Sequence, residues 1–96
     1  MRIEFLDAAK NEIRDAYDWY QQKAGIGQNF LDEFEAGLGA ISSHPTRWPK
    51  VSKLSRRYRL RRYPYGIVYQ IFQDVIFVTT VMHLARRPGY WRDREI

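Results

Sequence analysis

The sequence contains no cysteine, so a disulfide scaffold and a cysteine-based zinc site are both excluded. Uninterrupted apolar runs are only a few residues long, as at positions 75–78, which excludes a transmembrane helix and a signal-peptide core. No glycine-rich phosphate loop follows a strand pattern, and the two histidines, His44 and His83, lie far apart without an HxxxH spacing. We therefore expect a cytoplasmic protein that uses no metal and no cofactor.

The 96 residues suffice for one small domain, which we predict to span residues 1–96. Hydrophobic residues make up 45% and charged residues 28%, as in ordinary globular proteins rather than disordered ones. Aromatic residues reach 16%, and each ring can bury a large apolar area, which helps so small a core.

Charge is distributed unevenly between the two halves of the chain. Residues 1–46 carry a net charge of −4 and residues 47–96 a net charge of +9. The segment 47–62 contains eight basic residues and no acid. Such a density of like charge is favoured beside a polyanion or an acidic protein segment, although a solvated surface is the simpler alternative.

The first half predicts a strand and two helices. Residues 2–6 alternate as in a strand, and the Asp7 carboxylate can cap the helix that follows. Apolar residues then recur at steps of three and four on two helical faces, which residues 24–27 separate and Pro45 ends. Trp19 lies at the flank of the first face, and Gly37, at the edge of the second, permits close packing. The two faces consist of Ala9, Ile13, Ala16, Tyr17 and Tyr20, and of Phe30, Leu31, Phe34, Leu38 and Ile41.

The second half predicts three strands. From Arg57 the period becomes two, so that Tyr58 and Leu60 point one way while Arg57, Arg59 and Arg61 point the other. Residues 65–72 and 75–82 follow as strands joined by a tight turn. The expected fold is α+β: an N-terminal strand, a helical hairpin and a three-stranded antiparallel meander in one sheet, covered on one face by the helices.

The opposite face then keeps a row of three arginines, about 6.6–6.8 Å apart. That spacing suits the phosphates of a nucleic acid or the carboxylates of an extended acidic peptide, which arginine binds through a planar fork. Arginines on an exposed strand also protect sheets from aggregation, which is the structural alternative.

After the last strand the chain mixes basic and aromatic residues, the usual components of sites that hold bases and phosphates. From Leu84 the tail is too polar and too broken to belong to the core. Tyr90 and Trp91 could instead fold back and plug the sheet edge, and for Trp91 we favour that structural role. His83 is either a proton-transfer group or a half-buried residue at a strand end, and Glu12 has no acidic partner on its helix face.

The chain resembles the RelE/ParE superfamily of bacterial toxins over nearly its whole length, and its ParE branch more closely. The resemblance includes Ala9, Glu12, Ile13, Ala16, Trp19 and Tyr20 of the first helix. It continues through residues 27–31 (GQNFL), 45–49 (PTRWP), 61–69 (RRYPYGIVY) and 83–91 (HLARRPGYW). It implies the fold derived above, and a cognate antitoxin whose acidic C-terminal segment wraps and neutralises the toxin in a hetero-oligomer.

The two branches of the superfamily imply different targets. ParE-like toxins are not enzymes and act on DNA gyrase, whereas RelE-like toxins cut messenger RNA on the ribosome. Two arginines of the nuclease pattern fall on Gly66 and Leu84, for which Arg86 could compensate in part. A third alternative is a non-toxic, basic nucleic-acid-binding domain. If the chain is a nuclease, its candidate residues are Arg57, Arg59, His83, Arg86 and Tyr90.

A larger set is the candidate surface for the antitoxin or the target. Its members are basic or aromatic and lie on the second predicted strand or in the tail: Arg56, Arg57, Arg59, Arg61, Arg86, Arg87, Tyr90, Trp91 and Arg94. We expect a chain that ends before Arg86 to lose toxicity while its sheet still folds.

Overall fold

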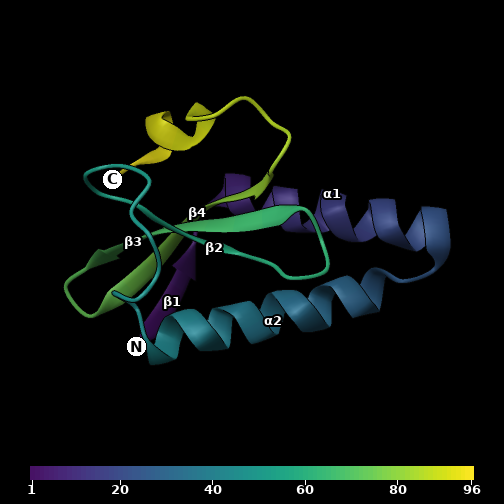
Figure 1. Cartoon of the computed structure of the whole chain (residues 1–96), viewed down its shortest axis with the longest axis horizontal. Helices are drawn as coiled ribbons and strands as arrows, with labels where there is room; N and C mark the ends of the chain where they lie inside the picture. Colours follow the sequence, from purple (N-terminus) through teal and green to yellow (C-terminus); the bar gives the residue numbers. More distant parts are fainter.

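The computed structural model describes all residues from 1 to 96 and contains four strands, two α-helices and a short 3-10 helix (Figure 1). In chain order these are β1 (Arg2–Phe5), α1 (Asp7–Ala24), α2 (Gly27–Ser43), β2 (Arg56–Arg59), β3 (Tyr65–Phe72), β4 (Val75–His83) and η1 (Tyr90–Arg94). The sheet order is β1-β4-β3-β2. The α+β prediction is confirmed: β2, β3 and β4 form the antiparallel meander, and β1 pairs with β4 in parallel.

The hairpin of α1 and α2 turns at Gly25, whose φ of 65° is left-handed. Its N–H donates to the carbonyl of Gln21 at 3.0 Å, which closes the end of α1. The Asp7 cap was wrong: Leu6 occupies the N-cap position without a side-chain hydrogen bond, and Asp7 lies 4.0 Å from Lys10.

The main core lies between the helices and one face of the sheet. Rings of both helices meet there, with Tyr20 and Phe30 stacked at 5.4 Å and the Tyr63 ring edge-on to Tyr20 at 4.8 Å. Gly37 lets α2 approach closely, because a Cβ on it would lie 2.9 Å from the Tyr58 ring. The predicted close packing at Gly37 is therefore confirmed. The sheet supplies Ile67, Tyr69, Ile76, Val78 and Val81 to this core.

A β-bulge in β4 determines which residues reach that core. Val68 is opposite Thr80 and Tyr69 is opposite Val78, so Thr79 is an extra residue. Without it, Val78 and Val81 would point to opposite faces, since side chains alternate along a strand. The bulge places both in the same core.

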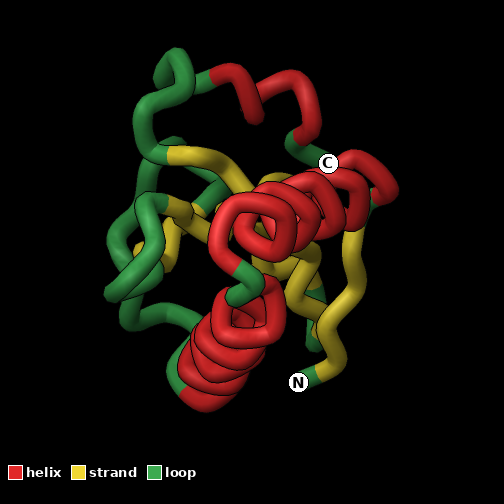
Figure 2. The backbone as a smooth tube through the Cα atoms, turned by 90° about the vertical axis from the view of Figure 1, so that its right-hand side faces the viewer, coloured by secondary structure: helices red, strands yellow, loops and turns green.

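The second face of the sheet is partly covered by the C-terminal segment. In Figures 1 and 2, η1 and α2 lie at opposite sides of the molecule. Trp91 is only 4% exposed and packs on Val68 and Met82. The prediction that the tail stays out of the core was wrong, because the indole provides enough apolar area to cover this face. The structural role of Trp91 is confirmed, on the sheet face rather than its edge.

Polar contacts fasten the last residues. The hydroxyls of Ser52 and Ser55 each donate to the Glu95 carboxylate at 2.5 Å, and the N–H of Ile96 donates to Gln70 Oε1 at 2.7 Å. Neither α-helix of the fold combines the length and the apolar character needed to cross a membrane.

Candidate functional site: a cationic pocket beside an aromatic pocket

Arg57 lies over the open face of the sheet, away from the helices. Its neighbour Tyr58 packs toward the core, so strand alternation turns Arg57 outward. On β3, Val68 pairs with Arg57 and Gly66 pairs with Arg59. The stem of Arg57 reaches diagonally over Gly66, and a Cβ there would lie 2.9 Å from Cδ of Arg57. The missing side chain of Gly66 therefore makes room for the arginine stem.

Four arginines surround one hollow of about 450 Å³, which we call the arginine pocket. Arg57 comes from β2, and the other three come from the segment after β4. Trp91 and Met82 also line the hollow, and no acidic residue does. Gly89, with φ of 82°, turns the chain so that η1 returns over the sheet. The arginines are Arg57, Arg86, Arg87 and Arg92.

The predicted row of three arginines was wrong for Arg61. β2 ends at Arg59, because Leu60 is buried and its N–H donates to the carbonyl of Tyr65 at 2.9 Å. Arg61 instead lines a hollow that contains Asp32 and Glu33 of α2.

Two further predicted arginines are engaged within the fold. Arg56 donates to the carbonyls of Thr46 and Trp48 at 2.9 and 2.8 Å, and Arg94 pairs with Glu12 at 2.7 Å. Both guanidinium groups hold loops or termini in place. Arg59 stays exposed at the end of β2.

Glu12 connects three elements that are distant in sequence. Its Oε1 accepts from the N–H of Val81 at 3.0 Å and from Nη1 of Arg94 at 2.7 Å, and its Oε2 accepts from the Tyr90 hydroxyl at 2.9 Å. β1 pairs with β4 only as far as Val78, so the Val81 N–H has no acceptor on β1. The Glu12 carboxylate accepts this hydrogen bond instead. Sequence reasoning missed this role, because the partners lie 69 to 82 residues away.

Tyr90 is a hydrogen-bond donor here rather than a base. Burial raises its pKa above the ordinary value, and the hydrogen bond to Glu12 and the charge of that carboxylate raise it further. Arg86, whose guanidinium lies 4.3 Å from the Tyr90 ring centroid, and Arg94 lower it by less. At neutral pH the phenol therefore keeps its proton, directed at Glu12.

A second hollow, of about 250 Å³, shares Arg86 with the arginine pocket. We call it the aromatic pocket, because four rings line it: Trp19, Tyr65, His83 and Tyr90. Glu12 and Asp15, three residues apart on α1, both line it as well, so the expectation that Glu12 has no acidic partner on its helix face was wrong.

His83 is half-buried at the end of β4, as one of the two predicted alternatives states. Its ring meets Tyr65 edge-on at 5.0 Å, and its Nδ1 accepts from the N–H of Ala85 at 3.1 Å. No group of three or more His, Asp or Glu side chains lies close enough to hold a metal ion.

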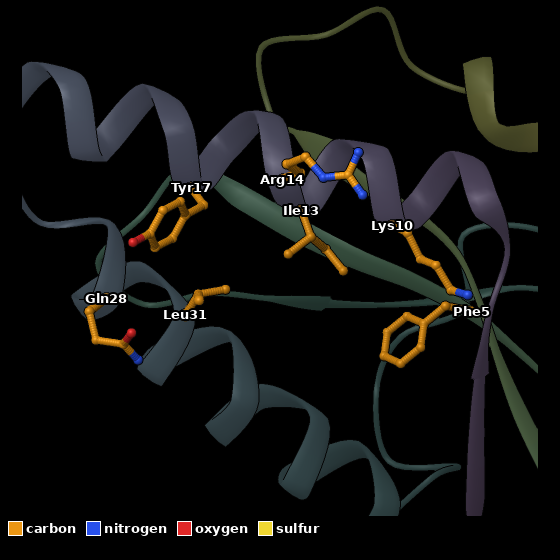
Figure 3. A pocket seen from close by; sticks show the side chains of 7 residues that line it. All are labelled: Phe5, Lys10, Ile13, Arg14, Tyr17, Gln28 and Leu31. Carbon is orange, nitrogen blue, oxygen red and sulfur yellow. The ribbon is translucent and has the colours of Figure 1, made fainter.

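A third hollow lies on the helical side, between α1 and α2 (Figure 3). Its volume is about 450 Å³, and its apolar wall includes Phe5, Ile13 and Leu31. Lys10 and Arg14 of α1 border it. Sequence reasoning assigned Ile13 and Leu31 to the buried faces and did not find this groove.

Over residues 3–88 the sequence matches the family described as ParE toxin of type II toxin-antitoxin system, parDE. The chain belongs to the ParE toxin family. The expected resemblance to the RelE/ParE superfamily, closer to ParE, is thus confirmed, and the chain is a toxin of the type II class. No curated protein matches the sequence.

Solved structures support the ParE fold. The chain is similar to one in a structure titled Chromosomal ParDE TA system from P. aeruginosa, with a TM-score of 0.78 and 13% identity, covering 88% of this chain and 96% of that one. It is also similar to the isolated E. coli RelE toxin, with a TM-score of 0.65 and 21% identity, covering 96% and 93%. At such identities the likeness concerns the fold.

Proposed function

We propose that this ParE-family chain inhibits DNA gyrase and is neutralised by the acidic C-terminal segment of a cognate antitoxin. The observation that carries the proposal is the arginine pocket, where four guanidinium groups meet without an acid. Like charges at this density repel one another, and an anionic partner relieves the repulsion. Arginine forks hold carboxylates through paired, charge-assisted hydrogen bonds, which suits an extended acidic segment.

The state of Tyr90 supports inhibition by binding over cleavage of RNA. A nuclease needs a residue that can take up or release a proton near neutral pH. The pKa of Tyr90 is raised and its proton is directed at Glu12. Gly66 and Leu84 also provide no cation where the RelE-like pattern has arginines.

Purified protein added to a gyrase supercoiling and DNA-cleavage assay tests the target. We expect loss of supercoiling and accumulation of cleaved DNA. Unchanged supercoiling at excess protein, together with cut messages on stalled ribosomes, would establish the RelE-like alternative instead. Unhindered growth of cells that express the chain without a partner would favour the non-toxic, nucleic-acid-binding alternative.

The antitoxin surface is tested with the double variant Arg57→Ala, Arg59→Ala and a peptide copied from the C-terminal segment of the antitoxin. Two charge-assisted contacts are lost, so we expect Kd to rise at least about tenfold. Lys10→Ala combined with Arg14→Ala removes an equal charge from the helical side and serves as the control. An equal Kd for the double variant and the control would remove β2 from the antitoxin surface.

A further inference from the structure

We propose that the arginine pocket and the aromatic pocket together bind one segment of single-stranded nucleic acid. Phosphates lie on the arginines, and one base enters the aromatic pocket. The proposal does not require gyrase inhibition; within the proposed function, the strand is the DNA that gyrase holds.

The arginine pocket is built for more than one anion. None of its four arginines forms an ion pair within the fold, whereas Arg2, Arg62 and Arg94 do. Met82 and Trp91 line it, so the guanidinium groups border apolar surface. Successive nucleotides of a single strand carry closely spaced phosphates. Several neighbouring guanidinium groups can therefore bind such phosphates at the same time.

The aromatic pocket provides the stacking surface that nucleic-acid strands use. Trp19 is 56% exposed on α1, although most large apolar side chains of the helices are buried. The Lys23 ammonium lies 4.9 Å from the Trp19 ring centroid, so the indole also stands beside a cation. Aromatic rings next to basic groups bind bases by stacking, largely irrespective of sequence.

Arg86 connects the two pockets. It lines both, and its guanidinium lies 4.3 Å from the Tyr90 ring centroid, held over a ring that Glu12 fixes. A base in the aromatic pocket and its phosphate in the arginine pocket therefore lie on the two sides of one side chain. A nucleotide has the matching arrangement, with a flat ring and an anion on one sugar.

The carboxylate of Asp15 indicates which anions fit. Asp15 lines the aromatic pocket and takes part in none of the ion pairs of the fold. A carboxylate repels a bare polyphosphate or a run of glutamates that fills both pockets. It accepts hydrogen bonds from the amino group of adenine, cytosine or guanine. A ligand with phosphates at one end and a donor-bearing base at the other meets both requirements.

Neutralisation then has a physical explanation. The acidic segment of the antitoxin places carboxylates on the same arginines that hold the phosphates. The two ligands compete for the arginine pocket, and only the nucleic acid also occupies the aromatic pocket.

The test is fluorescence anisotropy with the full chain and labelled eight-nucleotide strands of deoxycytidine, deoxythymidine and cytidine. We expect log Kd to rise linearly with log salt, with a slope of about 0.7 for each phosphate contact. Arg86→Ala should lower that slope by about 0.7. Trp19→Ala should weaken binding about tenfold and leave the slope unchanged, since stacking releases no counterions.

Matched controls separate binding from folding. Arg14→Ala removes a charge near the helical groove, and Phe72→Ala removes a ring that is 58% exposed at the β3–β4 turn. Both should bind like the unchanged chain. Thermal unfolding of every variant verifies that the fold is intact. The deoxycytidine and cytidine strands distinguish DNA from RNA as the source, and weaker binding of deoxythymidine supports the role of Asp15.

Three results would overturn the proposal. One is an equal effect of Trp19→Ala and Phe72→Ala on the affinity. Another is a salt slope that Arg86→Ala leaves unchanged. The third is binding of pyrophosphate or polyglutamate as tight as binding of the strands. Strand binding without gyrase inhibition would reject the proposed target alone, and gyrase inhibition without strand binding would reject this inference alone.

Discussion

The two faces of the sheet are stabilised by different forces. The face under α1 and α2 is covered by interlocking rings and aliphatic chains. The other face has one cluster of three buried residues, Val68, Met82 and Trp91, and is otherwise fastened by directed polar contacts. A dry, apolar interface stabilises the fold, whereas an open face keeps its arginines available. Stability and binding are thus assigned to opposite sides of a four-stranded sheet.

The largest expected effect comes from removing residues 86–96. This truncation exposes Val68 and Met82 and deprives Glu12 of two partners, so we expect the free energy of unfolding to fall by about 4 kcal/mol or more. Urea denaturation measures it. The sequence alone predicts that the sheet folds without the tail. An unchanged urea midpoint would support that prediction and show that the C-terminal segment does not stabilise the open face.

Single ring deletions compare the two faces directly. Phe30→Ala should cost about 3–5 kcal/mol, because Phe30 is fully buried among rings that cannot collapse into the space. Trp91→Ala should cost about 2–3 kcal/mol, since its smaller cluster adjoins the open arginine pocket and water can enter. Both values come from chemical denaturation. A larger cost for Trp91→Ala would reverse the comparison.

Glu12→Ala tests the polar fastening of the open face. The change leaves the Val81 N–H and the Tyr90 hydroxyl without their acceptor and the Arg94 guanidinium without its carboxylate partner, and we expect the free energy of unfolding to fall by about 1–3 kcal/mol. Glu12→Gln keeps the shape and one acceptor oxygen, which can still accept from the Val81 N–H, and should cost less than Glu12→Ala. Glu4→Ala, which breaks the exposed pair with Arg2, is the control and should change stability by under about 0.5 kcal/mol.

Two glycines provide a matched pair. At Gly37 an added Cβ meets the Tyr58 ring at 2.9 Å and Ile67 at 3.2 Å, so Gly37→Ala should destabilise by about 1–3 kcal/mol. At Gly66 the obstacle is the flexible stem of Arg57, so Gly66→Ala should change stability by less and instead weaken strand binding as Arg57 moves. In thermal unfolding, Gly37→Ala should have the larger effect. In the anisotropy measurement of strand binding, Gly66→Ala should have the larger effect.

The ionisation of Tyr69 at alkaline pH tests the helical side of the sheet. Its effect on stability near neutral pH is the smallest of those predicted here. Burial raises the pKa of Tyr69 to about 12, and the charge of Arg56 only partly opposes this. The folded state therefore favours the neutral phenol, whose contribution to stability is complete below pH 10 and declines as the pH rises toward 12. Tyr69→Phe should flatten that decline in pH-dependent denaturation. An equally steep decline in the variant would assign it to other groups.

Much of the fold was predictable from the sequence because its signals are local. The apolar faces that contain Ala9 and Phe30, the turn at residues 24–27 and the strand-rich second half all follow from periods of 3.6 and 2. The turn from β3 to β4 and the place of Trp19 at the flank of the first helical face followed from the same patterns. The cap at Asp7 was the local error, since Leu6 is the N-cap instead.

The site was less predictable, because its members meet only across the sheet. The arginines at 57 and 86 stood out by charge, but nothing in their spacing places them around one pocket. Arg56 and Arg94 looked the same in sequence and are bound within the fold. Glu12 entered only through the family resemblance, and nothing in the sequence showed its role, since its partners come from β4 and η1.

The amino-acid sequence by itself determined the helices, the strands and the excess of positive charge in the second half, because propensity, periodicity and charge are properties of neighbours along the chain. Only the tertiary structure decided which arginines stay free to bind a partner and which form hydrogen bonds or ion pairs within the fold. That choice depends on whether a carboxylate or carbonyl from a distant element reaches the guanidinium, and such encounters exist only once the sheet has assembled.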